Sequence, residues 1–358
     1  MLIGFAAACI LTPLARTMAV RCGVIDRPVG PKIHVRPTPL MGGVAVYLSF
    51  VLAALTILPP TKPVVGLLLG GLVAVVVGVL DEIRNLPPPV HLAGQIGAAL
   101  VAVLTGVGIV RSVSDPFSGL TAPALPVPAV IGLVFTLFWL VGMMNTMNFL
   151  DGMDGLVTGI AALAALLLAV WASEPSRFYL PPTLHHEDLL LPLALAGALL
   201  GFLPYNWHVA RIFIGDSGTM FLGLALGALS IVGPAKLGTA LLVLLVPVLD
   251  VAWAIVRRQL SGRSFLAGDK QHVYHRMREL GLGYTTIVLL LYFLCLALAV
   301  LDLELTKLAK LIAFLLLALV TGASFVALEL RATRRVRQLP FRQVADRPED
   351  DHGVQPSG

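Results

Sequence analysis

An eleven-residue segment, Asn145–Gly155, places two amides, two carboxylates and two glycines between long apolar runs. It reads Asn-Thr-Met-Asn-Phe-Leu-Asp-Gly-Met-Asp-Gly. Ionisable side chains are costly next to lipid and usually mark a functional site there. Asp151 and Asp154 are three residues apart, so one helical turn would place both on the same face. Gly152 and Gly155 would let the backbone approach a ligand closely. The segment therefore predicts a polar site at the end of a membrane span.

The composition of the chain is that of an integral membrane protein. Of 358 residues, 58% are hydrophobic and 13% are charged, which excludes an ordinary soluble domain. Apolar runs of about 17–25 residues are typical of transmembrane helices. We expect an all-α fold, a single polytopic domain of ten or eleven helices over residues 1–330, followed by a basic and then acidic cytoplasmic tail at 331–358 that is disordered. The candidate spans are residues 1–20, 40–58, 63–80, 92–110, 127–144, 156–172, 189–203, 218–233, 237–255, 284–302 and 308–328.

The distribution of basic residues predicts the orientation of the chain. If all eleven runs span the membrane, 19 of the 25 Lys and Arg residues lie on one side. The positive-inside rule makes that side cytoplasmic. Basic loops also favour anionic lipid head groups and anionic substrates, so the net charge of +5 requires no nucleic-acid partner. We expect a multi-pass protein of the plasma (inner) membrane whose active-site loops are cytoplasmic.

The candidate reactive side chains fall in the loops of that same side. They are Lys32, His34 and Arg36; Asp81 and Glu82; Asn145, Asn148, Asp151 and Asp154; Asn206, Arg211, Asp216 and Ser217; and Asp269, Lys270, His272 and His275. Carboxylates that meet at one membrane face suggest a divalent cation, and oxygen ligands favour Mg²⁺ or Mn²⁺ over zinc. Mg²⁺ uses one or two carboxylates together with substrate phosphates, and basic residues hold the remaining charge. The expected substrate is therefore a phosphorylated molecule, a diphosphate, next to lipid.

Five motifs follow one another between residues 26 and 278. They are Asp26-Arg-Pro with Lys32-Ile-His34 and Pro39-Leu-Met-Gly-Gly43; Gly78-Val-Leu-Asp81-Glu82; the segment Asn145–Gly155; Asn206 with Ala210-Arg-Ile-Phe-Ile-Gly215-Asp216-Ser-Gly218; and Asp269-Lys-Gln-His272-Val-Tyr-His275-Arg276. In this order they resemble the polyprenyl-phosphate N-acetylhexosamine-1-phosphate transferase family. That family includes the undecaprenyl-phosphate N-acetylglucosaminyl-1-phosphate transferases and the phospho-MurNAc-pentapeptide translocase.

The resemblance implies a reaction and its participants. A UDP-N-acetyl sugar donates sugar-1-phosphate to undecaprenyl phosphate, which releases UMP and leaves a lipid-linked diphosphate sugar for cell-envelope polysaccharides such as lipopolysaccharide or teichoic acid. Mg²⁺ is required, with Mn²⁺ as a substitute, and a homodimer is compatible with the family. By resemblance, Asp216 and Asp151 are metal ligands, and Asp81, Glu82, Asp151 and Asp154 are catalytic. The substrate-binding residues are Lys32, His34, Arg36, Asn145, Asn148, Asn206, Asp269, His272, His275 and Arg276.

The sequence departs from the family pattern at three positions. Glu82 stands where a second Asp is usual, Asn85 takes the place of a third acidic residue, and Tyr274 replaces a histidine. The spacing His272-x-x-His275 is similar to that of the N-acetylglucosamine subgroup. UDP-GlcNAc is therefore the expected donor, with transfer of phospho-MurNAc-pentapeptide in peptidoglycan synthesis as the alternative.

Other classes of function are distinguished by where the carboxylates lie. In a membrane transporter or flippase, the acidic residues would form an ion relay near the bilayer midplane, whereas here they are expected at one face. The motif of the CDP-alcohol phosphotransferases is absent after Asp151-Gly152. A non-catalytic relative is a further alternative, because three family positions differ.

Overall fold

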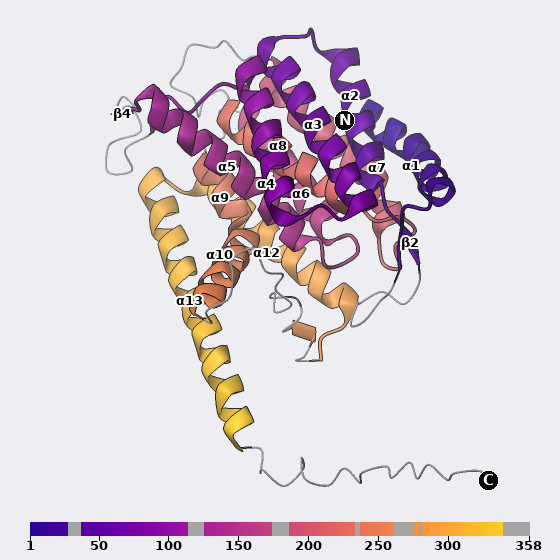
Figure 1. Ribbon diagram of the computed structural model, residues 1–358. Coiled ribbons are helices and arrows are strands. Elements are labelled where there is room, and N and C mark those ends of the chain that lie inside the picture. Colours follow the sequence, from indigo (N-terminus) through magenta and orange to yellow (C-terminus); the bar gives the residue numbers. More distant parts are fainter. Residues whose placement is uncertain are drawn as a thin grey trace, which may run out of the picture.

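The computed structural model describes residues 1–27, 37–113, 125–173, 186–232, 237–260, 274, 277–278 and 281–338, and these form a bundle of α-helices (Figure 1). In chain order the helices are α1 (Leu2–Cys22), α2 (Gly42–Ile57), α3 (Lys62–Arg84), α4 (Pro88–Ala102), α5 (Ala129–Leu150), α6 (Leu156–Ala172), α7 (His186–Asn206), α8 (Gly215–Val232), α9 (Leu237–Val243), α10 (Leu245–Leu260), α12 (Tyr284–Glu304) and α13 (Lys307–Gln338). A π-helical turn, Val103–Val107, extends α4. Two antiparallel strand pairs are very short: β1 (Ile25–Asp26) with β2 (Thr38–Pro39), and β3 (Ser112–Val113) with β4 (Leu125–Pro126).

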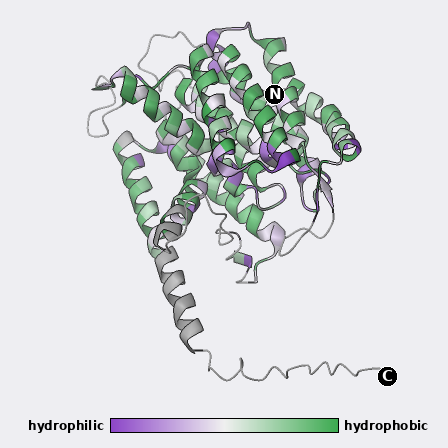
Figure 2. Cartoon of the chain, in the orientation of Figure 1, coloured by the Kyte–Doolittle hydropathy of each residue, from purple (hydrophilic) through white to green (hydrophobic). Residues whose placement is uncertain are grey.

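Helices occupy all eleven predicted apolar runs, so the predicted all-α polytopic fold is confirmed. Within the described ranges, seven helices are long and apolar enough to cross a membrane, or eight if a bent pair forms one span. Shorter apolar helices include α2 and α6. Hydrophobic residues cover most of the helical surface, and the hydrophilic ones gather where helices end (Figure 2). This is the distribution that a hydrocarbon surrounding requires.

One predicted span differs from the structure. The run 237–255 is broken into α9 and α10, which are bent by 81°. Pro247 lies in the first turn of α10, where a helix tolerates proline, whereas in the middle of one continuous helix it would remove a backbone hydrogen bond. At the C-terminus, α13 continues to Gln338, and most of the predicted tail at 331–358 lies outside the described residues.

Helix α8 lies at the centre of the bundle. It packs against α2, α3 and α5, and 83% of its residues are buried. Small residues allow this close approach: a Cβ on Gly43 would lie 2.0 Å from the backbone nitrogen of Gly218, and a Cβ on Gly223 would lie 2.3 Å from Cα of Met144. Membrane helices associate through such small-residue contacts because lipid provides no hydrophobic force between them. The first turn of α8 is therefore held firmly against three neighbours.

Candidate functional site

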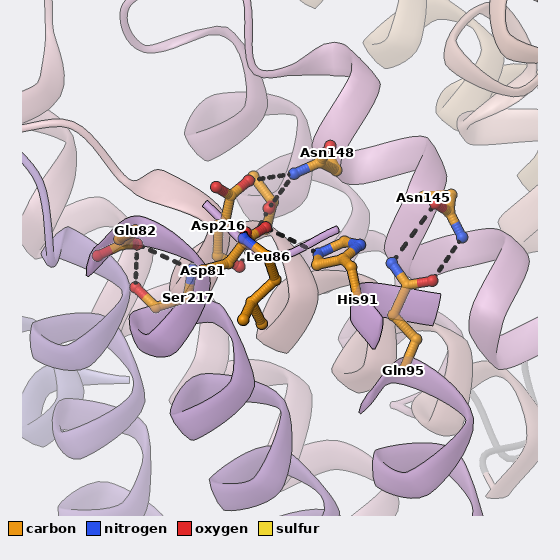
Figure 3. Close-up of polar contacts among 10 residues, drawn as sticks. Asp81, Glu82, Leu86, His91, Gln95, Asn145, Asn148, Asp216 and Ser217 are labelled. Carbon is orange, nitrogen blue, oxygen red and sulfur yellow. Dashed lines mark hydrogen bonds and ion pairs between the residues drawn. The ribbon is translucent and has the colours of Figure 1, made fainter. Parts of the chain in front are cut away.

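The ends of three helices meet at one end of the bundle and bring predicted site residues together (Figure 3). Asp81 lies in the last turn of α3, Asn148 in the last turn of α5, and Asp216 in the first turn of α8. The side-chain amide of Asn148 donates to Oδ1 of Asp216, and also to the Thr219 hydroxyl at 3.2 Å. The charges of Asp81 and Asp216 are close enough to act on each other. The structure thus gathers oxygen-bearing side chains that are more than sixty residues apart in sequence.

The glycine motif before α2 positions the start of α8. The backbone N–H of Gly42 donates to the carbonyl of Phe213 at 3.0 Å, and that of Gly43 donates to Ile214 at 2.8 Å. In return, the N–H of Phe213 donates to the carbonyl of Pro39 at 2.9 Å. These backbone hydrogen bonds fix the extended segment that leads into Gly215 and Asp216. The glycine motif before α2 therefore supports the site through its main chain.

Glu82 contacts the first turn of α8. Its Oε1 accepts hydrogen bonds from the backbone N–H of Ser217 at 2.9 Å and from the Ser217 hydroxyl at 2.7 Å. A carboxylate at a helix N-terminus satisfies free N–H groups and interacts favourably with the helix dipole. The second oxygen, Oε2, is buried without a hydrogen-bond partner among the described residues. The contacts of Glu82 make it an anchor for the helix that carries Asp216.

Asp81 is held by the turn that follows it. The backbone N–H of Leu86 donates to its Oδ1 at 2.6 Å, and Nε2 of His91 lies 3.5 Å from its Oδ2. The side chain remains 17% exposed. Asp81 can therefore reach a ligand at the end of the bundle, while Leu86 and His91 restrain the orientation of its carboxylate.

Asp151 ends α5, and its side chain is half-buried. Loss of hydration, together with the negative charges of Asp216, Asp154 and Glu82, raises the pKa of Asp151 well above its ordinary value. Such crowding of carboxylates favours binding of a cation, because the cation relieves their mutual repulsion. Asp151 and Asp216 were the predicted metal ligands, and the structure places their charges near each other.

Asp154 and Asn206 both hydrogen-bond to other parts of the protein. Oδ2 of Asp154 lies 3.0 Å from Nδ1 of His208 and accepts the N–H of Ala210 at 3.1 Å. Asn206 is buried, and its side-chain oxygen accepts the N–H of Gly155 at 3.1 Å. Both residues join the motif loop after α5 to the segment after α7. The catalytic role predicted for Asp154 and the substrate-binding role predicted for Asn206 stay predictions, and both side chains also support the loop through these contacts.

Asn145 also has an internal partner. Its side-chain nitrogen donates to Gln95 at 2.9 Å and to the carbonyl of Val141 at 2.8 Å. The amide nitrogen of Gln95 faces the Asn145 oxygen at 3.4 Å. This reciprocal pair joins α4 to α5, and the substrate-binding role of Asn145 stays a prediction.

The C-terminal part of the chain supplies aromatic supports for the motif loop. The Tyr284 ring stacks on His208 with centroids 4.0 Å apart, and its hydroxyl meets the N–H of Asp154. The hydroxyl of Tyr292 donates to the carbonyl of Gly155. Sequence reasoning missed these residues, because a tyrosine in an apolar span gives no sign of which loop its hydroxyl meets.

Tyr274, which replaces a family histidine, is buried against Gly152. A Cβ on Gly152 would lie 1.9 Å from the Tyr274 hydroxyl oxygen, so glycine is required for this contact. Burial and the charges of Asp250 and Asp151 raise the pKa of Tyr274, and the hydroxyl stays protonated. The departure from the family pattern is therefore accommodated by packing.

Seven predicted substrate-binding residues lie outside the described residues. They are Lys32, His34, Arg36, Asp269, His272, His275 and Arg276. Among the side chains that the structure does describe, no three His, Cys, Asp or Glu residues are grouped to hold a metal ion. A magnesium site does not need such a group, because one or two carboxylates and substrate phosphates suffice. Asp216, with Asn148 beside it, fits that smaller requirement.

Known proteins resemble the chain along most of its length. Residues 64–234 match the profile of glycosyl transferase family 4. A decaprenyl-phosphate N-acetylglucosaminephosphotransferase of Mycolicibacterium smegmatis is 37% identical over 327 residues, which cover 81% of this chain and 78% of the relative. A probable undecaprenyl-phosphate N-acetylglucosaminyl 1-phosphate transferase of Bacillus subtilis is 31% identical over 80% of this chain and 78% of the relative.

A more distant relative carries the alternative donor in its name. The phospho-N-acetylmuramoyl-pentapeptide-transferase of Moorella thermoacetica is 37% identical, but over 113 residues that cover 31% of this chain and 34% of the relative. The two longer matches extend far beyond this shared segment. The chain therefore belongs to glycosyl transferase family 4, the polyprenyl-phosphate N-acetylhexosamine-1-phosphate transferases that its motifs resemble.

Proposed function

We propose that the protein transfers N-acetylglucosamine-1-phosphate from UDP-GlcNAc to a polyprenyl phosphate and releases UMP. The observation that carries this proposal is the pair of long matches to N-acetylglucosamine phosphotransferases, each covering about four fifths of the chain. The match to the phospho-N-acetylmuramoyl-pentapeptide-transferase covers less than a third of it. The product, a lipid-linked diphosphate sugar, would serve cell-envelope polysaccharide synthesis.

The position of the site suits a lipid-bound acceptor. A polyprenyl phosphate keeps its tail in the membrane and presents its phosphate at the surface, where helices end. Asp81 and Asp216 lie at such helix ends. A transporter would instead need its acidic residues near mid-span on interrupted helices. We place this end of the bundle at the cytoplasmic face of the plasma membrane, since most basic residues belong to the loops of that side.

The proposed chemistry is a phosphoryl transfer between two phosphates. An oxygen of the acceptor phosphate attacks the β-phosphorus of UDP-GlcNAc, and the bond from that phosphorus to the UMP oxygen breaks. Such reactions depend mainly on positioning and on stabilisation of charge. Asp81 orients the acceptor phosphate or takes its proton, and the phosphate's second pKa near 6 makes a strong base unnecessary.

Mg²⁺ is the proposed cofactor, with Mn²⁺ as a substitute. Asp216 and Asp151 would hold it, and Asn148 keeps Asp216 in place through its amide hydrogen bond. When bound, the ion supplies positive charge to the donor diphosphate. Glu82 and Ser217 fix the first turn of α8, so the Asp216 carboxylate is presented in one orientation.

The test is release of UMP by purified protein in detergent. Undecaprenyl phosphate and Mg²⁺ are supplied with either UDP-GlcNAc or UDP-MurNAc-pentapeptide, and an Asp216→Ala protein serves as the inactive control. Release with UDP-GlcNAc alone is the expected result. Release with the pentapeptide donor alone would keep the reaction and change the donor. Full magnesium-dependent turnover by the Asp216→Ala protein would overturn the metal assignment.

A further inference from the structure

The turn between α3 and α4 is built around Asp81. The N–H of Asn85 donates to the Asp81 carbonyl at 2.8 Å, and the N–H of Leu86 donates to the Asp81 carboxylate at 2.6 Å. Asn85 has a left-handed backbone with φ of 48°, which asparagine tolerates better than most residues. Three prolines, at positions 87–89, then start α4 with restricted φ. The chain direction after Asp81 is therefore strongly determined.

Helix α4 presents two polar side chains toward the site. His91 and Gln95 are four residues apart and so share one face of the helix. Gln95 is fully buried and pairs with Asn145 of α5. Because this amide pair fixes the rotation of α4 against α5, it also fixes where His91 points. Figure 3 shows His91 directed toward Asp81, between the Gln95–Asn145 pair and Asp216.

We propose that His91 is a positioning residue for the Asp81 carboxylate, a role that rests on the proposed function. Its Nε2 is buried, has no hydrogen-bond partner among the described residues, and faces Oδ2 of Asp81 at 3.5 Å. Buried polar atoms in proteins nearly always find a partner. A shift of about half an ångström would give this pair hydrogen-bond geometry. Such contacts in free enzymes often tighten only when substrate binds.

The charged groups around Asp81 also favour a contact between His91 and its carboxylate. The charges of Asp81, His91 and Asp26 all act on Asp216, so His91 lies among the carboxylates of the site. An imidazole N–H directed at Oδ2 holds the Asp81 carboxylate toward α4. The other oxygen, Oδ1, is already held by Leu86. With both oxygens restrained, Asp81 meets the acceptor phosphate in a single orientation.

The decisive variants are His91→Ala and His91→Gln, because glutamine restores an N–H donor that alanine lacks. Removing a residue that orients a metal ligand typically costs about 10–100-fold in activity, and we expect a comparable loss for a residue that orients a catalytic carboxylate. We therefore expect kcat of the His91→Ala protein to fall by at least about tenfold. The KM for UDP-GlcNAc should stay unchanged, since His91 acts on the acceptor side. The His91→Gln protein should recover most of the lost kcat.

The matched control is His186→Ala, which removes an exposed histidine at the start of α7. Its kcat and both KM values should equal those of the wild type. A second readout avoids turnover: equilibrium binding of undecaprenyl phosphate, measured without donor, for wild type, His91→Ala, Asp81→Asn and the double variant. We expect His91→Ala to weaken binding several-fold when Asp81 is present and to change it little when Asp81 is replaced.

The results of these measurements either support or overturn the positioning role of His91. Unchanged kcat in His91→Ala, or equal losses in His91→Ala and His91→Gln, would overturn the positioning role while the wild-type activity stands. Equal effects of His91→Ala with and without Asp81 would show that His91 does not act through that carboxylate, which also overturns the role. A wild-type protein that neither releases UMP nor binds undecaprenyl phosphate would overturn the proposed function, and the inference with it.

Discussion

Replacing Asn206 by alanine should separate the motif loop from the segment after α7. The side chain is 2% exposed and makes three hydrogen bonds. Its oxygen accepts from the N–H of Gly155 at 3.1 Å and from the Thr158 hydroxyl at 2.7 Å, and its nitrogen donates to the carbonyl of Ile212 at 3.1 Å. Each such bond contributes about 1 kcal/mol net, and buried partners left unpaired cost more. Asn206→Ala should therefore lower the free energy of unfolding by about 3 kcal/mol or more.

Thermal unfolding in detergent measures this loss. An effect of that size should lower the apparent Tm by about 4 °C in a chain of this length. Thr158→Val is the matched control, because it removes one of the three hydrogen bonds and keeps the side-chain volume. It should lower stability by about one third as much, since only one bond of about 1 kcal/mol is lost. The reasoning would be refuted if the Asn206→Ala protein melted within about 1 °C of the wild type. It would also be refuted if the Tm of Asn206→Ala fell no further than that of Thr158→Val.

Three further changes test other parts of the structure. Gly43→Ala should prevent stable folding, measured as loss of monodisperse protein in size-exclusion chromatography, because its Cβ would lie 2.0 Å from the backbone nitrogen of Gly218. Lys310→Met should lower the apparent Tm, since it leaves the fully buried carboxylate of Asp302, 2.8 Å from the Lys310 ammonium, without its ion pair, at a cost of about 3–5 kcal/mol. Asp216→Asn should reduce magnesium-dependent UMP release about 100-fold or more, as loss of a main electrostatic group does, without lowering Tm.

The sequence predicted the helices well because apolar length determines a membrane span. A run of about twenty apolar residues has few alternatives in lipid, since every backbone group must be hydrogen-bonded within it. Asp81 and Asp216 could be placed at one end of the bundle for the same reason, as their motifs adjoin such runs. The break between α9 and α10 had a signal in Pro247, but hydropathy alone joined the two helices.

The partners of individual polar residues could not be predicted. Asn206 and Asn145 have the same side chain, yet one supports a loop and the other pairs with a glutamine on a different helix. Such contacts join segments about fifty residues apart, and a single sequence does not record which segments meet. The polar pair His91 and Gln95 in α4 was a usable signal, because two polar residues four apart in an apolar helix face the protein interior.

The burial of α8 has a consequence for how the chain enters the membrane. Of the seven candidate spans, α8 is the least apolar and has the largest buried share. A segment like this partitions weakly into lipid by itself, so we expect it to insert by docking on helices that are already present. Its main partners α2, α3 and α5 all precede it in the chain. During synthesis, the first half of the protein would thus act as the receptor for α8, and a nascent chain stopped before residue 215 would expose glycine-lined helix faces to the cell's quality-control proteases.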